Sequence, residues 1–274
     1  MQASPRSLDR NPDLKVAAVY DREVDACLSG VWENVYDWEH LPWLHDQAFT
    51  SIDLIESGDW GWLARIGGPK AEESVIELVT DREASCYVAR TIEGKGAPSE
   101  IWTSLRSTRE PDDPTATTSI RVEFCIPSLP ERKMAAIGRS YLEVYTKLWD
   151  QDEEMMQTRA ERRSAVSVHS DPKSVDLGLA SDLKGRLPIR FEWGGHAFRL
   201  IEQDGSFFAH SAECPHWGGP LSACDVEKGE ITCPWHGYRF EVAAGRSSDG
   251  RNLRLRPAPR IVLDAAKGSL TATK

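Results

Sequence analysis

The chain has 274 residues, which is enough for two domains of ordinary size, each with its own core. Its formal net charge of -10 at pH 7 argues against a nucleic acid or an anionic membrane as partner, and leaves basic partners possible. Neither an apolar leader nor a run of about 18 apolar residues is present, so we expect a cytoplasmic protein that does not span a membrane.

The first 163 residues predict an α+β domain. A β-branched run at 16–20 predicts a strand, and apolar residues at three- and four-residue steps predict a helix from Asp25 to about His40. Six alternating or β-branched segments, separated by Gly, Pro and Asp, predict an antiparallel meander. These segments are 51–55, 60–66, 74–79, 85–91, 101–107 and 118–124. A long helix is expected from Pro130 to about Arg163.

This order of elements is similar to that of the helix-grip (START-like) fold. In that fold an antiparallel sheet wraps a long C-terminal helix around an apolar cavity. The resemblance implies that residues 14–163 form one such domain. Five of its tryptophans agree with an apolar or aromatic ligand, although tryptophan is also ordinary core filling. They are Trp32, Trp43, Trp60, Trp62 and Trp102.

Two histidines near the expected first helix are candidate metal ligands. His40 and His45 are five residues apart, which puts them about 140° apart on a regular helix. Pro42 lies between them, and we expect it to break the helix so that the two imidazoles can approach each other. Either histidine alone is more often a core or surface residue, and this alternative stays open.

The long helix offers four acids, namely Asp150, Asp152, Glu153 and Glu154. At about 100° per residue, only Asp152 falls inside the apolar stripe that contains Tyr141, Tyr145 and Leu148. A carboxylate on a buried stripe needs a partner, and a metal is an adequate one. Asp152 is therefore the candidate third ligand, with an ion pair to Arg159 as the alternative.

Residues 164–186 show no clear periodicity and predict a linker, and residues 187–273 predict a second domain of short strands. In this second part, the runs 214–221 (CPHWGGPL) and 233–240 (CPWHGYRF) each contain one cysteine and one histidine ligand candidate. Two thiolates and two imidazoles are the set that binds a [2Fe–2S] cluster of mixed ligation. The alternatives are unrelated buried thiols or a structural zinc, but Cys2His2 fingers place both thiolates before both imidazoles. The remaining four cysteines are scattered, as expected of reduced thiols.

The two runs resemble the cluster-binding loops of Rieske proteins, which assigns Cys214, His216, Cys233 and His236 to one [2Fe–2S] cluster. The segment 34–45 has the pattern N-x-x-D-x-x-H-x-x-x-x-H and resembles the iron-binding segment of Rieske non-heme iron oxygenases, whose catalytic domain is a helix-grip fold. That resemblance implies one Fe(II) held by His40, His45 and Asp152, a two-histidine, one-carboxylate set. It departs from the family in one respect, because here the catalytic domain precedes the Rieske domain.

The resemblance also implies catalytic roles for Asn34 and Asp37. In the family this aspartate bridges an iron-ligand histidine to a Rieske histidine, usually on a neighbouring subunit of a ring, so we expect a homotrimer.

The implied activity is that of an oxygenase component, a mono- or dioxygenase of the EC 1.14 type. It would receive electrons from a ferredoxin or an NAD(P)H-dependent reductase and use O2 to hydroxylate or oxidatively dealkylate an apolar or aromatic small molecule. The alternative is a ligand-binding helix-grip domain fused to a Rieske ferredoxin that acts only in electron transfer or sensing. The substrate and the reaction type stay open.

Overall fold

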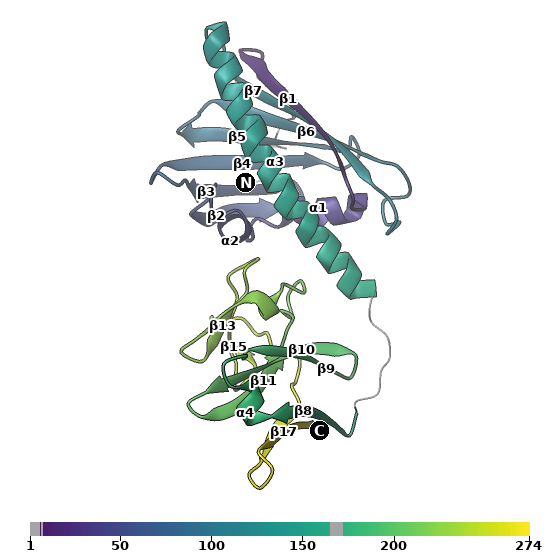
Figure 1. Cartoon of the computed structure of the whole chain (residues 1–274). Coiled ribbons are helices and arrows are strands. Elements are labelled where there is room, and N and C mark those ends of the chain that lie inside the picture. Colours follow the sequence, from purple (N-terminus) through teal and green to yellow (C-terminus); the bar gives the residue numbers. More distant parts are fainter. Residues whose placement is uncertain (1–5, 7, 165–171) are drawn as a thin grey trace. The chain divides into compact units, whose positions relative to one another are not determined.

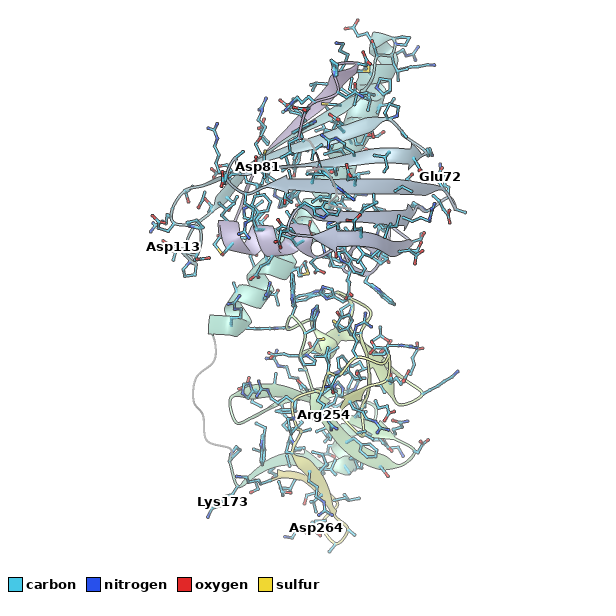
Figure 2. All side chains as sticks on the ribbon, turned by 180° about the vertical axis from the view of Figure 1, so that it is seen from behind. Glu72, Asp81, Asp113, Lys173, Arg254 and Asp264 are labelled. Atoms are coloured by element: carbon cyan, nitrogen blue, oxygen red, sulfur yellow. The ribbon has the colours of Figure 1, made fainter. Side chains whose placement is uncertain are left out.

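In the computed structural model, which describes residues 6, 8–164 and 172–274, one antiparallel sheet of seven strands dominates the first part of the chain. Its order is β1-β7-β6-β5-β4-β3-β2. The strands are β1 (Leu14–Val24), β2 (Ser51–Gly58), β3 (Gly61–Gly67), β4 (Glu73–Asp81), β5 (Cys86–Gly94), β6 (Ser99–Ser107) and β7 (Thr118–Pro127). The predicted six-stranded meander is confirmed as β2 to β7, and β1 joins it as an edge strand beside β7. Glu72 and Asp81 mark the two ends of β4 (Figure 2).

Strand β7 shows why these segments form a sheet with one face toward the core. Ile120, Val122 and Phe124 alternate along it and are buried. Between them Arg121 points away, where its guanidinium lies 2.9 Å from the carboxylate of Asp21, its cross-strand partner on β1. This period of two is the signature of a strand with two different faces.

Helix α3 (Glu131–Ser164) confirms the predicted long helix and crosses one face of the sheet (Figure 1). Trp149 and Met156 of α3 are buried in a core cluster with Trp62, Leu78 and Tyr87 of the sheet. The sheet and α3 thus enclose the apolar interior of this unit.

The helix expected at 25–40 is shorter than predicted: α1 covers Leu28–Tyr36, and a separate short helix, α2 (Leu41–Leu44), follows beyond the predicted range. The chain leaves α1 at Asp37, whose backbone (φ -84°, ψ 85°) is not helical. The expectation that Pro42 ends the first helix is therefore wrong, because α1 ends before it. Pro42 lies in the first turn of α2, where a proline's missing amide hydrogen costs nothing.

The chain divides into two units, Met1–Gln157 and Thr158–Lys274, with the boundary inside α3. The second unit is made of short antiparallel strands in three small sheets, in the orders β11-β10-β9, β12-β13-β14-β15 and β16-β17-β8. The strands are β8 (Ser174–Leu179), β9 (Ile189–Trp193), β10 (His196–Gln203), β11 (Ser206–Ser211), β12 (Val226–Glu227), β13 (Glu230–Thr232), β14 (Arg239–Glu241), β15 (Arg246–Ser247), β16 (Arg260–Asp264) and β17 (Ser269–Thr273). Two short helices, α4 (Ala180–Leu183) and η1 (Leu221–Ala223), complete it. Arg254 lies in the segment between β15 and β16 (Figure 2).

Part of the segment 164–186, expected to be a linker, is folded. β8 pairs with β17, and Val175 and Leu177 pack against the core of the second unit. Two alternating apolar residues were too short a pattern to predict a strand. The segment forms one because β17 supplies its hydrogen-bonding partner. In the part of the chain that the structure describes, no helix is long and apolar enough to cross a membrane.

Candidate metal centre and cluster site

Three side chains with metal-binding atoms converge inside the first unit, and they are the three that the sequence singled out. The candidate ligand atoms of His40, His45 and Asp152 lie within 4.8 Å of one another, and all three residues are buried. Asp152 Oδ1 is 3.0 Å from His45 Nε2 and 3.5 Å from His40 Nε2. Two imidazole nitrogens and a carboxylate facing one point form a donor set suited to a ferrous ion with open positions.

Local structure explains how the two histidines meet. His40 and His45 flank the single turn of α2, as its N-cap and C-cap residues. Their ring centroids are 5.1 Å apart and the ring planes meet at 76°. Asp152 reaches the same point from α3, so the site ties two distant segments together.

A second layer of polar side chains orients each ligand. Gln151 Oε1 lies 2.9 Å from His45 Nδ1, and Asp37 Oδ2 lies 3.3 Å from His40 Nδ1. An amide or carboxylate oxygen can only accept, so Gln151 accepts from Nδ1–H of His45, and Asp152 Oδ1 accepts from Nε2–H of the same ring. A metal bound at Nε2 would replace that second proton, while Gln151 still holds the proton on Nδ1. Asn34 Nδ2 donates to Asp152 Oδ1 at 3.0 Å. The residues present therefore fit a bound metal.

Gln151 is a residue that sequence reasoning missed. Its neighbour Asp152 was found from the helical stripe, but nothing in the spacing showed that Gln151 reaches His45. The other three acids of α3 lie elsewhere: Asp150 and Glu153 pair with Arg22, and Glu154 is exposed.

Burial acts to raise the pKa of Asp152, but the hydrogen bond and charge of His45, helped by His40 and Asn34, hold that pKa below its usual value. Burial acts to lower the pKa of His45, but Asp152 and Gln151 raise it overall. The two groups thus stabilise the charged forms of each other. Buried groups with this mutual dependence are typical of functional sites and of metal-binding sites.

A cavity of about 310 Å³ adjoins the triad. Its walls come from α1, α2, the sheet and α3, and are mainly apolar. Its lining residues other than the triad and its polar neighbours include Val35, Leu41, Phe49, Trp62, Ile66, Ile76, Leu78, Ala89, Ile101, Leu148 and Trp149.

The tryptophans support an aromatic ligand less well than the sequence suggested. Of the five noted there, only Trp62 lines the cavity. Trp43 is 48% exposed, and Trp60 and Trp102 belong to, or pack against, a separate core cluster.

The second unit brings together Cys214, His216, Cys233 and His236 on two loops of matching backbone geometry. In each loop the cysteine carbonyl accepts from the glycine four residues on, Gly218 at 3.0 Å and Gly237 at 2.9 Å. Each cysteine N–H donates to the carbonyl five residues on, at 2.9 Å in the first loop and 2.8 Å in the second. Both glycines have a positive φ, 78° and 67°, which other residues adopt at a cost.

The two loops leave room for a shared group only because residue 219 is a glycine. A Cβ atom at Gly219 would lie 2.5 Å from the Sγ atom of Cys233. The hydrogen bond between the two thiols lowers the pKa of Cys233 below its ordinary value and raises the pKa of Cys214. The rings of His216 and His236 are 4.6 Å apart. Two adjacent sulfurs, two adjacent imidazoles and a close-fitting glycine suit a [2Fe–2S] cluster of mixed ligation.

Arg199 of β10 supports the first cluster loop from behind. This buried guanidinium donates to the carbonyl oxygen of Leu221 at 3.1 Å and to that of Cys224. Bonds from a charged donor are stronger than neutral ones, so Arg199 fixes the chain that follows the loop. A single arginine within a strand gave no sign of this role in the sequence.

Comparisons with known proteins agree with the second site. A family model described as Rieske [2Fe-2S] domain matches residues 173–257, which include both loops. The chain is 29% identical over 93 residues to apoptosis-inducing factor 3 of Mus musculus, across 34% of this chain and 15% of that protein. It is 30% identical over 91 residues to the ferredoxin component of the alkene monooxygenase system of Xanthobacter autotrophicus, across 32% of this chain and 74% of that protein.

Among solved structures, the ferredoxin of carbazole 1,9a-dioxygenase from Nocardioides aromaticivorans is 27% identical. The match covers 38% of this chain and 100% of that chain, with a TM-score of 0.33. The chain thus spans 74% of one ferredoxin and 100% of the other, but only 15% of the apoptosis-inducing factor 3 of Mus musculus.

Proposed function

Because this chain belongs to the Rieske [2Fe–2S] family, we propose that it is the oxygenase component of a Rieske-type system, with its first unit as a helix-grip catalytic domain. One observation carries the proposal: His40, His45 and Asp152 converge, buried, beside an apolar cavity. A domain that only bound a ligand would need none of these three side chains. The Rieske domain itself supports a [2Fe–2S] cluster and hence electron transfer.

When bound, the cluster supplies one-electron transfer and a ferrous ion in the triad supplies activation of dioxygen toward an organic substrate. The chain's own residues prepare both sites. Gln151 accepts from Nδ1 of His45 and Asp37 lies 3.3 Å from Nδ1 of His40, so in each ring Nε2 is the nitrogen that would bind a metal. Asn34 fixes the carboxylate of Asp152.

The cavity adds a substrate site next to the triad. Its apolar walls hold a hydrophobic molecule and keep water away from the three ligands. We infer an apolar or aromatic small molecule as substrate, together with O2. The electrons would come from a ferredoxin or an NAD(P)H-dependent reductase, and Asp37 would link the two metal sites within a homotrimer.

A second candidate function has an observation in its favour. Two of the relatives described above are themselves named as ferredoxins of oxygenase systems. Under this alternative the protein transfers electrons only, and the first unit binds a ligand without transforming it.

Metal content separates the two functions. Protein reconstituted anaerobically is expected to contain one iron beyond the two of a [2Fe–2S] cluster. His40→Ala should remove only the additional iron, and Cys233→Ser should remove the cluster. O2 consumption with a chemical reductant and a surrogate reductase should require both the cluster and the additional iron. If His40→Ala has the same iron content as the unchanged protein, the catalytic site is wrongly assigned and the electron-transfer function stands.

A further inference from the structure

The cavity beside the triad has a second polar region, made by three tyrosines. Tyr87 comes from β5, and Tyr141 and Tyr145 come from α3; all three line the cavity. The rings of Tyr141 and Tyr145 pack against Phe124 with centroid distances of 4.7 Å each, one stacked and one edge-on. This packing fixes the two rings and so fixes the direction of their hydroxyl groups.

Helix α3 gives the cavity its length. Asp152, Tyr145 and Tyr141 all line the same cavity, at steps of seven and four residues along one helix. At a rise of 1.5 Å per residue, Tyr145 is about 10 Å and Tyr141 about 16 Å along the axis from Asp152. These are separations of backbone positions along the helix axis, and a ligand that contacts both Asp152 and Tyr141 lies along that axis.

The tyrosine end of the cavity is polar but uncharged. Burial raises the pKa of Tyr87 to about 12, and it also raises the pKa values of Tyr141 and Tyr145. The phenols are therefore neutral hydrogen-bonding groups at any physiological pH. Among the described residues that line this cavity there is no lysine or arginine.

Resting on the proposed function, we propose that the substrate is an elongated, neutral molecule. It is apolar where it meets the triad, and it carries an uncharged hydrogen-bonding group, such as an amide, carbonyl or hydroxyl, at the end near Tyr141 and Tyr145. A cavity of about 310 Å³ is at the small end for ligand sites, so the molecule is of about two rings.

The free-energy cost of burying a polar group depends on its charge and on its hydrogen-bonding partners. A neutral amide buried at the tyrosine end finds donors and acceptors in the phenols, which offsets its loss of water. A carboxylate placed there is buried without a cation, and such burial is much more costly. The tyrosine end therefore disfavours an acidic group, because none of the described residues that line the cavity is a lysine or an arginine.

Three probes of the same shape test the proposal: biphenyl, biphenyl-4-carboxamide and biphenyl-4-carboxylate. Their binding to the full, reconstituted chain is measured anaerobically, without reductant, by calorimetry and by quenching of tryptophan fluorescence. We expect the carboxamide to bind about fivefold more tightly than biphenyl, as one net hydrogen bond allows. We expect the carboxylate to bind at least about 100-fold more weakly than the carboxamide.

Variants test whether the hydroxyl groups of Tyr141 and Tyr145 cause the preference for the carboxamide. The double variant Tyr141→Phe, Tyr145→Phe should lose the advantage of the carboxamide over biphenyl while still binding biphenyl, which shows that the cavity persists. Tyr20→Phe removes a phenol hydroxyl from a residue that does not line the cavity, and should change nothing. Should the double variant fail to fold, the carboxylate-to-carboxamide ratio of the unchanged protein still decides. The inference is overturned if the carboxylate binds as tightly as the carboxamide, or if the double variant keeps the carboxamide preference.

The same titrations on His40→Ala separate this inference from the proposed function. The preference for the neutral probe does not depend on iron, so it should persist in that variant. Equal iron content in His40→Ala and in the unchanged protein would refute the oxygenase while leaving the preference intact. A lost preference with the additional iron in place would refute only the substrate class.

Discussion

Replacing Gln151 with leucine tests whether the second layer of side chains prepares the triad for a metal. Gln151 Oε1 accepts from His45 Nδ1 at 2.9 Å, and His45 is buried. Without that acceptor, a neutral ring keeps its one proton on Nε2, where Asp152 Oδ1 accepts it at 3.0 Å. A proton on Nε2 occupies the position that a metal needs.

The magnitude follows from the bond that the metal must then displace. A hydrogen bond to a charged acceptor contributes about 1.5–3 kcal/mol, and each 1.4 kcal/mol is about tenfold in affinity. Gln151→Leu is therefore expected to weaken metal binding about 10- to 100-fold, which is also the range measured when such outer partners of metal ligands are removed.

The assay is an anaerobic competition for Fe²⁺ or Co²⁺ between the protein and a chelator, with the visible absorbance of the cluster as a check on folding. Gln151→Glu keeps an acceptor at the same place and should restore binding. Gln47→Leu makes the same change of side chain at an exposed position and should be silent. A Gln151→Leu protein that binds the metal within about twofold of the unchanged protein would refute the reasoning.

Three further outcomes are expected. Asp152→Ala should lose the additional iron and all O2-dependent turnover but keep the cluster spectrum, which iron analysis and an activity assay would show. Asp150→Ala removes only a surface ion pair, so it should leave turnover unchanged and lower the free energy of unfolding by at most about 1 kcal/mol, which thermal melts would show. Asp37→Asn should keep both metals and slow oxidation of the reduced cluster in a single turnover; an unimpaired rate would exclude its bridging role. Gly219→Ala should prevent cluster assembly because its Cβ would meet Cys233 Sγ at 2.5 Å, and a normal visible spectrum in this variant would contradict that geometry.

Much of the fold could be predicted because its signals are local. The meander follows from alternation within each strand, and α3 from one long helical pattern. The place of Asp152 inside the core followed from helical geometry alone, since a regular helix fixes which residues share a face. Val144, four residues before Leu148 and so close to the same stripe, is nevertheless 44% exposed, because periodicity gives a direction and not the extent of the sheet that covers it.

What could not be predicted depends on partners distant in the sequence. The approach of His40 and His45 was expected, but for the wrong reason: Pro42 lies in the first turn of α2 and does not break α1. The break lies at Asp37, a residue without a strong conformational signal. Gln151 and Arg199 make their contacts with segments 106 and 22 residues away, which no local pattern reveals. β8 likewise needs β17 beside it.

The two outer strands of the seven-stranded sheet share an irregularity. β1 has a register shift between Val16 and Ala18, and β2 has one between Leu54 and Glu56. A bulge bends an edge strand and interrupts the regular row of N–H and C=O groups that another strand would need. A further strand would therefore pair poorly with either outer strand, so the partly exposed Leu54 of β2 is not expected to promote aggregation through added strands. Association between copies of this chain by extension of this seven-stranded sheet is therefore disfavoured.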